Sequence, residues 1–451
     1  MELRLSFPDN NIVRTEKLGT SCRRCLVVLF LVALIPSLVF GSDPEEMHRE
    51  RTDSISVLRN RYRGRTTVED LVSIPGYLVY APLKSVFEVQ KFLIQQAFVT
   101  RVTERNFIVK IVDVFVADDG RRGILPTYSS SSGGGLKFYQ KGLFTPNSKL
   151  SLSATVGLRE RHQYRLKFKN IELSRRVNSQ FLIKYHFQSD ESFYGIGPQT
   201  GEDDRTNFAN EFVTAELNIG IRLSRKNRVG IIAGFDRNYI SRGRNRKYPS
   251  TTEVTSFASL PGMETAVKMG KLELGIQHDS RNHPGSPTSG FEALLCGAIF
   301  QQLDDDQYGF SRLVADVSRY FNLFYNRTVK LRLAGEFTES FRNRQTPFYY
   351  LSEMGRSETI RGFARGRFRG KDMVLGSIEY IYPIWAKINA HLFFDTGTVA
   401  SDMFKDFDTS NLKNGYGIGF SMWNNEEVLS DFTIAHSKEG FRFYLELNIS
   451  L

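Results

Sequence analysis

The strict alternation of apolar and polar residues at the carboxyl end of the chain is the strongest constraint on its fold. Phe441, Phe443, Leu445, Leu447, Ile449 and Leu451 alternate there with Arg442, Tyr444, Glu446, Asn448 and Ser450. Successive side chains of a β-strand point to opposite faces, so this segment forms a strand with one apolar and one polar face. The same period recurs in residues 150–158, 213–224 and 329–338, and it defines fifteen segments after Gly135 and a sixteenth around residues 123–132. The sequence therefore predicts an all-β protein.

The apolar faces can be covered either by a second sheet in a soluble sandwich or by lipid around a barrel. The segments are about ten residues or longer, which is the length at which a tilted strand crosses a bilayer. Aromatic residues gather at the ends of the segments, as they do at the membrane interfaces of barrels. They are Tyr320, Phe321, Phe324, Tyr325, Tyr382 and Trp385. We therefore expect a transmembrane antiparallel β-barrel of about sixteen strands over residues 123–451, closed so that no backbone edge faces lipid.

An apolar run from Leu26 to Phe40 follows a basic stretch and precedes the small residues Gly41 and Ser42. A positive region, a short apolar segment and small residues in this order are typical of a secretory signal peptide, which we assign to residues 1–41. An uncleaved anchor is the alternative interpretation. Because the formal net charge is +11, we expect the exported protein to have anionic partners such as lipid headgroups, and not nucleic acid.

The segment between the leader and the barrel lacks the alternation. Residues 42–70 are polar and charged and are expected to form a flexible lead-in. Residues 71–122 are expected to form a helical segment, because apolar side chains recur at helical spacing from Leu83 to Val102. This amphipathic helix could pack on a soluble core, lie on the membrane surface, or plug the barrel.

The polar faces of the strands are strongly basic. Arg165, Lys167, Lys169, Lys184, Arg222, Arg312, Lys330, Arg332 and Arg442 are all expected to point into the lumen. Two interpretations remain open, a solvated interior and a cavity that attracts anions.

A basic, glycine-rich segment interrupts the alternation between residues 341 and 370, and a loop of this length is usually functional or disordered. In the two following strands the alternation places Glu379 and Asp395 on the lumenal side. If the loop folds inward, Arg361 can form charge-assisted, bidentate bonds with one or both carboxylates. The alternative is three unrelated polar residues in a wet lumen.

Five motifs in their order and spacing resemble those of the BamA/TamA-type superfamily of outer-membrane assembly and translocation barrels, also called bacterial surface antigens. The resemblance covers residues 123–451. The motifs are Ile360-Arg361-Gly362-Phe363 with Arg367-Phe368-Arg369, Glu379-Tyr380-Ile381-Tyr382-Pro383-Ile384, Phe393-Phe394-Asp395-Thr396-Gly397, Phe193-Tyr194-Gly195-Ile196-Gly197, and Asp279-Ser280-Arg281 with Pro287-Thr288-Ser289-Gly290-Phe291.

The resemblance implies that Arg361 reaches into the lumen to meet Asp395, with Glu379 and Gly397 nearby. It also implies a Gram-negative outer-membrane protein that acts in insertion or assembly of outer-membrane proteins or in translocation, with lipid and nascent outer-membrane proteins as partners. Family members carry periplasmic POTRA modules, but residues 42–122 show neither the opening strand nor the second helix of such a module, so we expect none. The alternative function is a passive channel that prefers anions, or a barrel with a structural or lipid-handling role.

Catalytic chemistry is not expected. The sequence contains no G-x-S-x-G nucleophile elbow, phosphate loop or cluster of metal ligands, so we expect neither an enzyme nor a cofactor nor a metal site. We expect a monomer.

Overall fold

A computed structural model describes residue 117 and residues 121–129, 132–257, 259–323, 326–385, 387–423 and 427–447. The predicted signal peptide, the lead-in and the helix between Leu83 and Val102 lie outside these residues. The strands belong to one compact unit. Within the described part of the chain, no helix has both the length and the apolar character needed to cross a membrane.

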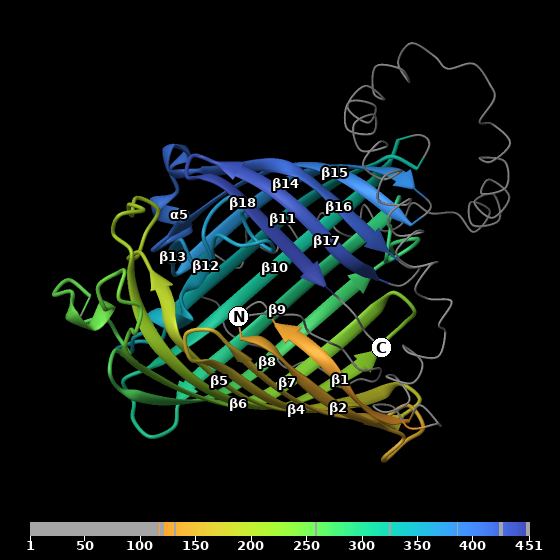
Figure 1. Ribbon diagram of the computed structural model, residues 1–451, viewed down its shortest axis with the longest axis horizontal. Helices are drawn as coiled ribbons and strands as arrows, with labels where there is room; N and C mark the ends of the chain where they lie inside the picture. Colours follow the sequence, from red (N-terminus) through yellow and green to blue (C-terminus); the bar gives the residue numbers. More distant parts are fainter. Residues whose placement is uncertain are drawn as a thin grey trace, which may run out of the picture. The chain divides into compact units, whose positions relative to one another are not determined.

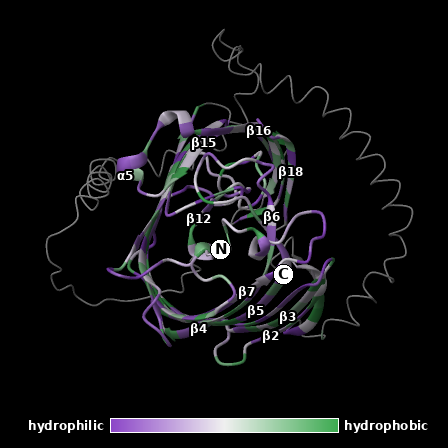
Figure 2. Cartoon of the chain, turned by 90° about the vertical axis from the view of Figure 1, so that its left-hand side faces the viewer, coloured by the Kyte–Doolittle hydropathy of each residue, from purple (hydrophilic) through white to green (hydrophobic). Residues whose placement is uncertain are grey.

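Sixteen strands form one antiparallel sheet in which each strand pairs with its neighbour in the sequence (Figure 1). They are β1 (Arg122–Ser129), β2 (Gly133–Lys141), β3 (Lys149–Gly157), β4 (Arg161–Ser174), β5 (Val177–Phe193), β6 (Thr206–Arg222), β7 (Asn227–Arg242), β8 (Ala266–Asp279), β9 (Gly290–Gln302), β10 (Gly309–Asn322), β11 (Thr328–Ser340), β14 (Asp372–Trp385), β15 (Ile388–Ala400), β16 (Lys413–Trp423), β17 (Val428–Ser437) and β18 (Gly440–Leu447). Viewed along its axis, the sheet curls into a barrel (Figure 2). The predicted fold class is confirmed, including the extra strand before Gly135. The expected closure is not seen among the described residues, in which β1 and β18 are not paired with each other.

The alternation predicts which side of each strand faces outward. Leu152, Leu331 and Phe443 on the apolar side are 53%, 42% and 68% exposed, whereas the residues that flank them are polar. The lipid-facing surface of the barrel therefore consists of the residues that alternation places there. The assignment of Tyr320 to the membrane interface was wrong. Tyr320 is only 6% exposed and lies opposite Lys330 on the lumenal side, whereas its neighbour Phe321 is 42% exposed on the outer side. Adjacent residues of a strand cannot both face lipid.

The connection between β11 and β14 is more ordered than its sequence indicates. It contains the 3-10 turn η3 (Phe348–Tyr350) and the short strands β12 (Ser352–Met354) and β13 (Phe368–Gly370), which pair with each other in a separate two-stranded sheet. In the described part of the chain, other connections contain the short helical turns η2 (Thr251–Glu253), α5 (Met403–Asp406) and η4 (Thr409–Asn411).

The apolar core lies inside the barrel, where this connection packs on the wall. One cluster joins Met354, Ile360, Phe363 and Phe368 of the connection to Met373 and Leu375 of β14 and Val399 of β15. A second joins Phe348 and Leu351 to Phe193, Phe208 and Ile240 of β5–β7, together with Met263. The connection of residues 341–370, hereafter the lumenal loop, is therefore held on both sides of the barrel by buried apolar contacts.

Candidate functional site

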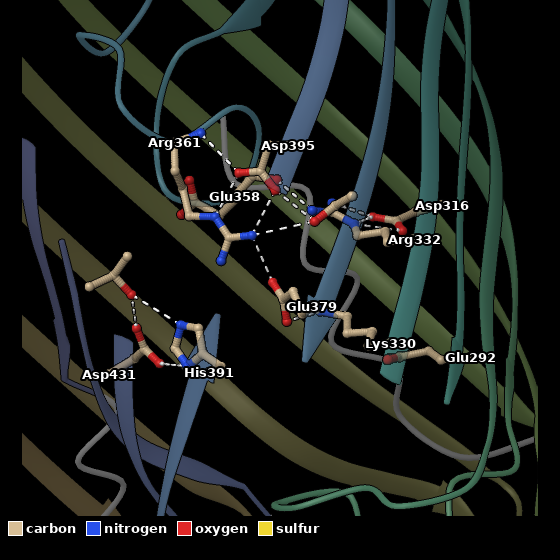
Figure 3. Close-up of polar contacts among 12 residues, drawn as sticks. Glu292, Asp316, Lys330, Arg332, Glu358, Arg361, Glu379, His391, Asp395 and Asp431 are labelled. Carbon is tan, nitrogen blue, oxygen red and sulfur yellow. Dashed lines mark hydrogen bonds and ion pairs between the residues drawn. The ribbon is translucent and has the colours of Figure 1, made fainter. Parts of the chain in front are cut away.

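Arg361 of the lumenal loop lies between two carboxylates of the barrel wall (Figure 3). Its Nε and Nη2 atoms lie 2.7 Å from Asp395 Oδ2 and Oδ1, and Nη2 lies 2.8 Å from Glu379. The backbone N–H of Arg361 also donates to Asp395 Oδ2 at 3.2 Å. The guanidinium stands over the Phe393 ring, 3.5 Å from its centroid. This is a bidentate, charge-assisted pair of the strongest kind, with a cation–π contact beneath it.

The register of β14 and β15 brings the two carboxylates together. Ser377 pairs with Asp395 and Glu379 pairs with Phe393. The two acids therefore lie on adjacent strands, offset by two residues along the lumenal face. Ser377 donates to Asp395 Oδ1 at 2.6 Å. Lys330 lies 3.4 Å from Glu379, so each carboxylate has more than one partner. Asp395 is fully buried, and its charge is stabilised only because Arg361 and Ser377 satisfy both oxygens.

Burial alone would lower the pKa of the Arg361 guanidinium, but Glu379 and Asp395 together raise it above its ordinary value. The Arg361 guanidinium therefore stays charged through the acidic, neutral and basic pH range.

Glycine lets the backbone of the loop approach the wall. Gly415 on β16 pairs with Asp395, and a Cβ atom at Gly415 would lie 1.9 Å from the carbonyl oxygen of Arg361. Gly362 adopts a φ of +94°, a left-handed conformation that L side chains rarely adopt. The glycine of the Arg361-Gly362-Phe363 motif thus turns the chain immediately after the anchor.

The same motif contacts the last strand of the sheet. Gly362 donates its N–H to Tyr444 Oη at 3.0 Å, and Tyr444 Oη donates to the carbonyl of Phe363 at 3.1 Å. Ser437, at the end of β17, donates to the carbonyl of Gly362 at 2.7 Å. The loop is therefore tied to β14 and β15 by ion pairs and to β17 and β18 by hydrogen bonds.

Replacing Tyr444 with phenylalanine is expected to destabilise the docked loop by about 1–3 kcal/mol, because the N–H of Gly362 loses its acceptor in a buried place. Hydrogen exchange at the Gly362 amide and the melting temperature report the effect. Tyr416→Phe is the matched control, since Tyr416 is 52% exposed on the outer surface of β16. Unchanged exchange at Gly362 in Tyr444→Phe would contradict the assignment.

Two further arginines of the loop are buried and paired. Arg367 Nε lies 2.8 Å from Glu439 in the turn between β17 and β18, and Arg367 Nη1 donates to Thr200 at 2.9 Å. Arg369 Nη2 lies 2.6 Å from Glu353 and 3.2 Å from Glu191 of β5. Both guanidinium groups are 1% exposed, so each depends on these acceptors for its solvation.

Acid is expected to weaken one of these contacts. Burial would raise the pKa of the Glu353 carboxyl, but Arg369, with Arg356 and Arg365, lowers it below its ordinary value. An unfolded glutamate titrates near pH ~4.3, so this contribution to stability is complete above that pH and is lost as the pH falls below it. The difference in melting temperature between wild type and Glu353→Gln should be largest near pH 5 and decrease as the pH falls further. A constant difference would show that the carboxylate charge is not involved.

The loop is also fastened to the opposite wall. Tyr350 Oη donates to Asp236 at 3.3 Å and accepts from Asn238 at 3.1 Å. Arg312 donates to the carbonyl of Tyr350 and lies 3.1 Å from Glu336. Burial, then Asp236, raises the pKa of the Tyr350 hydroxyl, so it remains a protonated donor.

Sequence reasoning located part of this site. Ile360, Arg361, Gly362, Phe363, Arg367 and Phe368 all lie in the buried, inward-folded part of the loop, and Glu379 and Asp395 meet Arg361. Gly397 follows Asp395 by two residues on the same face of β15. The atoms nearest to where its Cβ would be belong to Val374, Met354 and Leu375, so Gly397 makes room for the loop at Met354.

The two upstream motifs occupy different places. The N–H of Gly197 donates to the carbonyl of Arg369 at 2.7 Å, so the Phe193–Gly197 motif meets the lumenal loop. Asp279 and Arg281 form a bidentate pair with each other at the β8–β9 hairpin, at 2.7 and 2.9 Å, and stabilise that turn.

Sequence reasoning did not identify several partners of the loop. Glu439, Glu191 and Thr200 lie in turns or near strand ends, and Glu353 lies in the three-residue strand β12, so the alternation gives no direction for any of them. Tyr444 could have been found, because the alternation places it on the lumenal side of β18.

The chain is similar to known outer-membrane proteins. A family model for the Omp85 superfamily domain matches residues 143–424. A BamA from Haemophilus ducreyi lacking POTRA domains 1–3 has a similar structure, with a TM-score of 0.54 and 18% identity over 72% of this chain and 69% of that one. CdiB from Acinetobacter baumannii matches with a TM-score of 0.44 and 12% identity over 71% of this chain and 58% of its own. CdiB from Escherichia coli matches with a TM-score of 0.43 and 11% identity over 72% and 60%.

No curated protein sequence shows a significant match to the chain. The family match spans more than half of the chain and covers both the lumenal loop and the two carboxylate-bearing strands. Such barrels belong in the outer membrane of Gram-negative bacteria. The alternating strands, the sixteen-stranded fold and the family match lead to one conclusion: the chain is a member of the Omp85 superfamily.

Proposed function

We propose that this barrel promotes the insertion and assembly of other proteins in the outer membrane or their translocation across it, without catalysing a covalent reaction. Family membership supports a role in insertion or translocation. One observation carries the proposal: the lumenal loop is locked to the wall through Arg361 and bonded to the last strand through Tyr444.

The mechanism uses the two ends of the sheet. Among the described residues, β1 and β18 are the terminal strands and are not paired with each other. An unpaired strand edge is a template for another strand. Because Tyr444 and Ser437 bond to Gly362, the position of the loop sets the position of β17 and β18. We infer that a docked loop presents the β18 edge in one fixed geometry to a client strand.

The proposal includes a location and partners. Residues 1–41 are removed as a signal peptide on export, and the mature protein acts as a monomer. Its partners are outer-membrane lipid, which covers the apolar outer surface, and nascent outer-membrane proteins, whose strands pair at the edge.

Depletion of the protein in its native host, followed by quantitative proteomics of the outer membrane, tests this function. We expect many unrelated barrel proteins to fall together and to recover with the wild-type gene but not with Arg361→Ala. The matched control is Arg342→Ala, an exposed arginine at the beginning of the same loop, which should restore them. If the other barrels are unchanged on depletion, the assembly function is wrong.

The basic lumen favours a second candidate, a passive channel that prefers anions. Conductance in planar bilayers separates the two. A steady, anion-selective current after deletion of residues 42–104 would support the channel, whereas negligible or flickering current would leave assembly as the better account. Because this measurement needs no client protein, it is independent of the depletion experiment.

A further inference from the structure

A group of cations lies on the lumenal side of β2–β5. Lys137, Ser153, Arg165 and Lys184 form one row across β2–β5. Tyr139, Ser151 and Lys167 form the next row, and Lys141, Lys149 and Lys169 the one after it. We name Lys137, Arg165, Lys167 and Lys169 the basic wall.

The basic wall faces the lumen and not the membrane. The residues that alternate with it on the same strands are apolar or aromatic and exposed to the outside: Leu136 is 59% exposed, Leu152 53% and Tyr164 48%. Since side chains of a strand alternate between faces, the cations point inward. In Figures 1 and 2, β2–β4 lie on the side of the barrel away from β15 and β16, where Arg361 docks.

The charge of the basic wall is not balanced by the rest of the described structure. Within the residues that the structure describes, none of its four cations has a carboxylate within ion-pair distance, in contrast to Arg332, Lys330 and Lys271, which are all paired. Glu216 is the acidic group that acts on Lys167, and it is bound by Lys271 at 2.6 Å. Among the residues with a described placement, none accepts a hydrogen bond from the buried Nε of Arg165. Like charges held together in a confined space repel one another, so the wall gains stability from a bound anion.

One arginine of the lumenal loop extends this positive region. Arg361, Arg367 and Arg369 are buried and paired, whereas Arg365 is exposed and forms no ion pair within the described part of the chain. Arg365 and Lys184 both act electrostatically on His186, which lies in the row next to Arg165 and Lys184. The loop therefore places an accessible guanidinium at the edge of the same surface.

The dimensions of the basic wall indicate the ligand. Arg165, Lys167 and Lys169 follow one another at every second residue of β4, a repeat of about 6.6–6.8 Å. Alternate side chains of an extended peptide repeat at the same spacing. A single phosphate spans only one of these intervals, and a lipid would find no apolar surface for its acyl chains on this polar side. Ser153, between Lys137 and Arg165, can donate a hydrogen bond to a carboxylate.

We propose that the basic wall and Arg365 form a binding site in the lumen for an extended acidic segment of polypeptide, which lies along β4 with alternate carboxylates on Arg165, Lys167 and Lys169. This inference goes beyond the proposed function, because a binding site of this kind would exist in a channel as well as in an assembly factor.

Fluorescence anisotropy with a labelled peptide of alternating glutamate and serine tests the site in the full-length protein in detergent. We expect Arg165→Gln/Lys167→Gln/Lys169→Gln to weaken binding about tenfold or more, as three screened ion pairs are lost. The matched control, Arg175→Gln/Arg176→Gln/Arg225→Gln, removes the same charge from exposed turns and should bind as wild type does. Arg365→Gln should weaken binding by a smaller factor. Wild-type affinity should fall with added salt.

The triple variant should fold, because it relieves repulsion and breaks no ion pair of the described structure. Its migration on gels with and without heating checks this. If the control weakens binding equally, or if the wild type does not bind the peptide at physiological salt, the site is refuted. Inorganic phosphate or polyphosphate could instead bind to the wild type and bind more weakly to the triple variant, while the peptide does not bind. In that case the polypeptide assignment is wrong and the site is one for phosphate.

Discussion

Arg361→Ala is expected to release the lumenal loop and to destabilise the barrel by about 3–5 kcal/mol, the usual cost of breaking a buried ion pair from one side. Asp395, which is fully buried, would lose both hydrogen bonds from the guanidinium, and Glu379 would lose its 2.8 Å partner. Thermal unfolding, followed by heat-modifiable migration, gives the change in stability. Limited proteolysis within residues 355–366 reports whether the loop has left its place.

Neutralising Asp395 separates the loss of attraction from the cost of a buried charge without a partner. In Arg361→Met/Asp395→Asn the buried carboxylate is gone and Glu379 keeps Lys330 as a partner at 3.4 Å, so part of the stability should return, although Arg361 no longer holds the loop. Arg342→Ala controls for the removal of any arginine from this connection. An Arg361→Ala protein with wild-type stability and a protected loop would show that the apolar cluster around Phe363 and Phe368 holds the loop by itself.

Gly415→Ala is expected to displace the loop without changing any charge. The new Cβ would lie 1.9 Å from the carbonyl oxygen of Arg361, and this atom belongs to the backbone, which cannot turn aside as a flexible side chain can. Overpacking of this kind destabilises a folded protein by about 1–3 kcal/mol, and here relief requires movement of Arg361 away from Asp395. Melting temperature and the same proteolysis assay measure both consequences.

Gly297→Ala is the matched control, because Gly297 lies within β9 and nothing lies within 4 Å of the position of its Cβ. It has the same change in chain entropy and β-propensity without the clash. If both alanine variants behave alike, the close approach of the loop to β16 does not determine stability. If only Gly415→Ala exposes the loop and also fails to restore the outer membrane in depleted cells, the docked loop itself is required.

The alternation of side chains made most of the barrel predictable. Because side chains alternate with a period of two, the sequence indicates which face of a strand each residue occupies. The alternation alone is therefore enough to place Glu379, Asp395 and Tyr444 in the lumen. It says nothing about which inward residues meet. The choice of Asp395 as the main partner of Arg361 came from motif resemblance.

The other loop contacts were not predictable for a physical reason. Glu439, Glu191 and Thr200 lie at turns or strand ends, where local conformation and not periodicity sets direction. The pairing of β12 with β13 depends on three residues in each strand, too few to show a pattern. Tyr320 was misassigned because the clustering of aromatic residues takes no account of the alternation that divides neighbours between lumen and lipid.

The partners of the loop also constrain the order in which the barrel can form. Arg369 bonds to Glu191, which lies 178 positions earlier, Arg367 bonds to Thr200, 167 positions earlier, and Arg367 also bonds to Glu439, 72 positions later. Contacts between such distant positions form only after long stretches of chain have been closed. The two arginines can therefore be satisfied only when β5 and the β17–β18 hairpin are both in place. Burial of the loop is a late event that marks a completed barrel, and a chain stalled before its last hairpin would keep Arg367 in water, open to proteases.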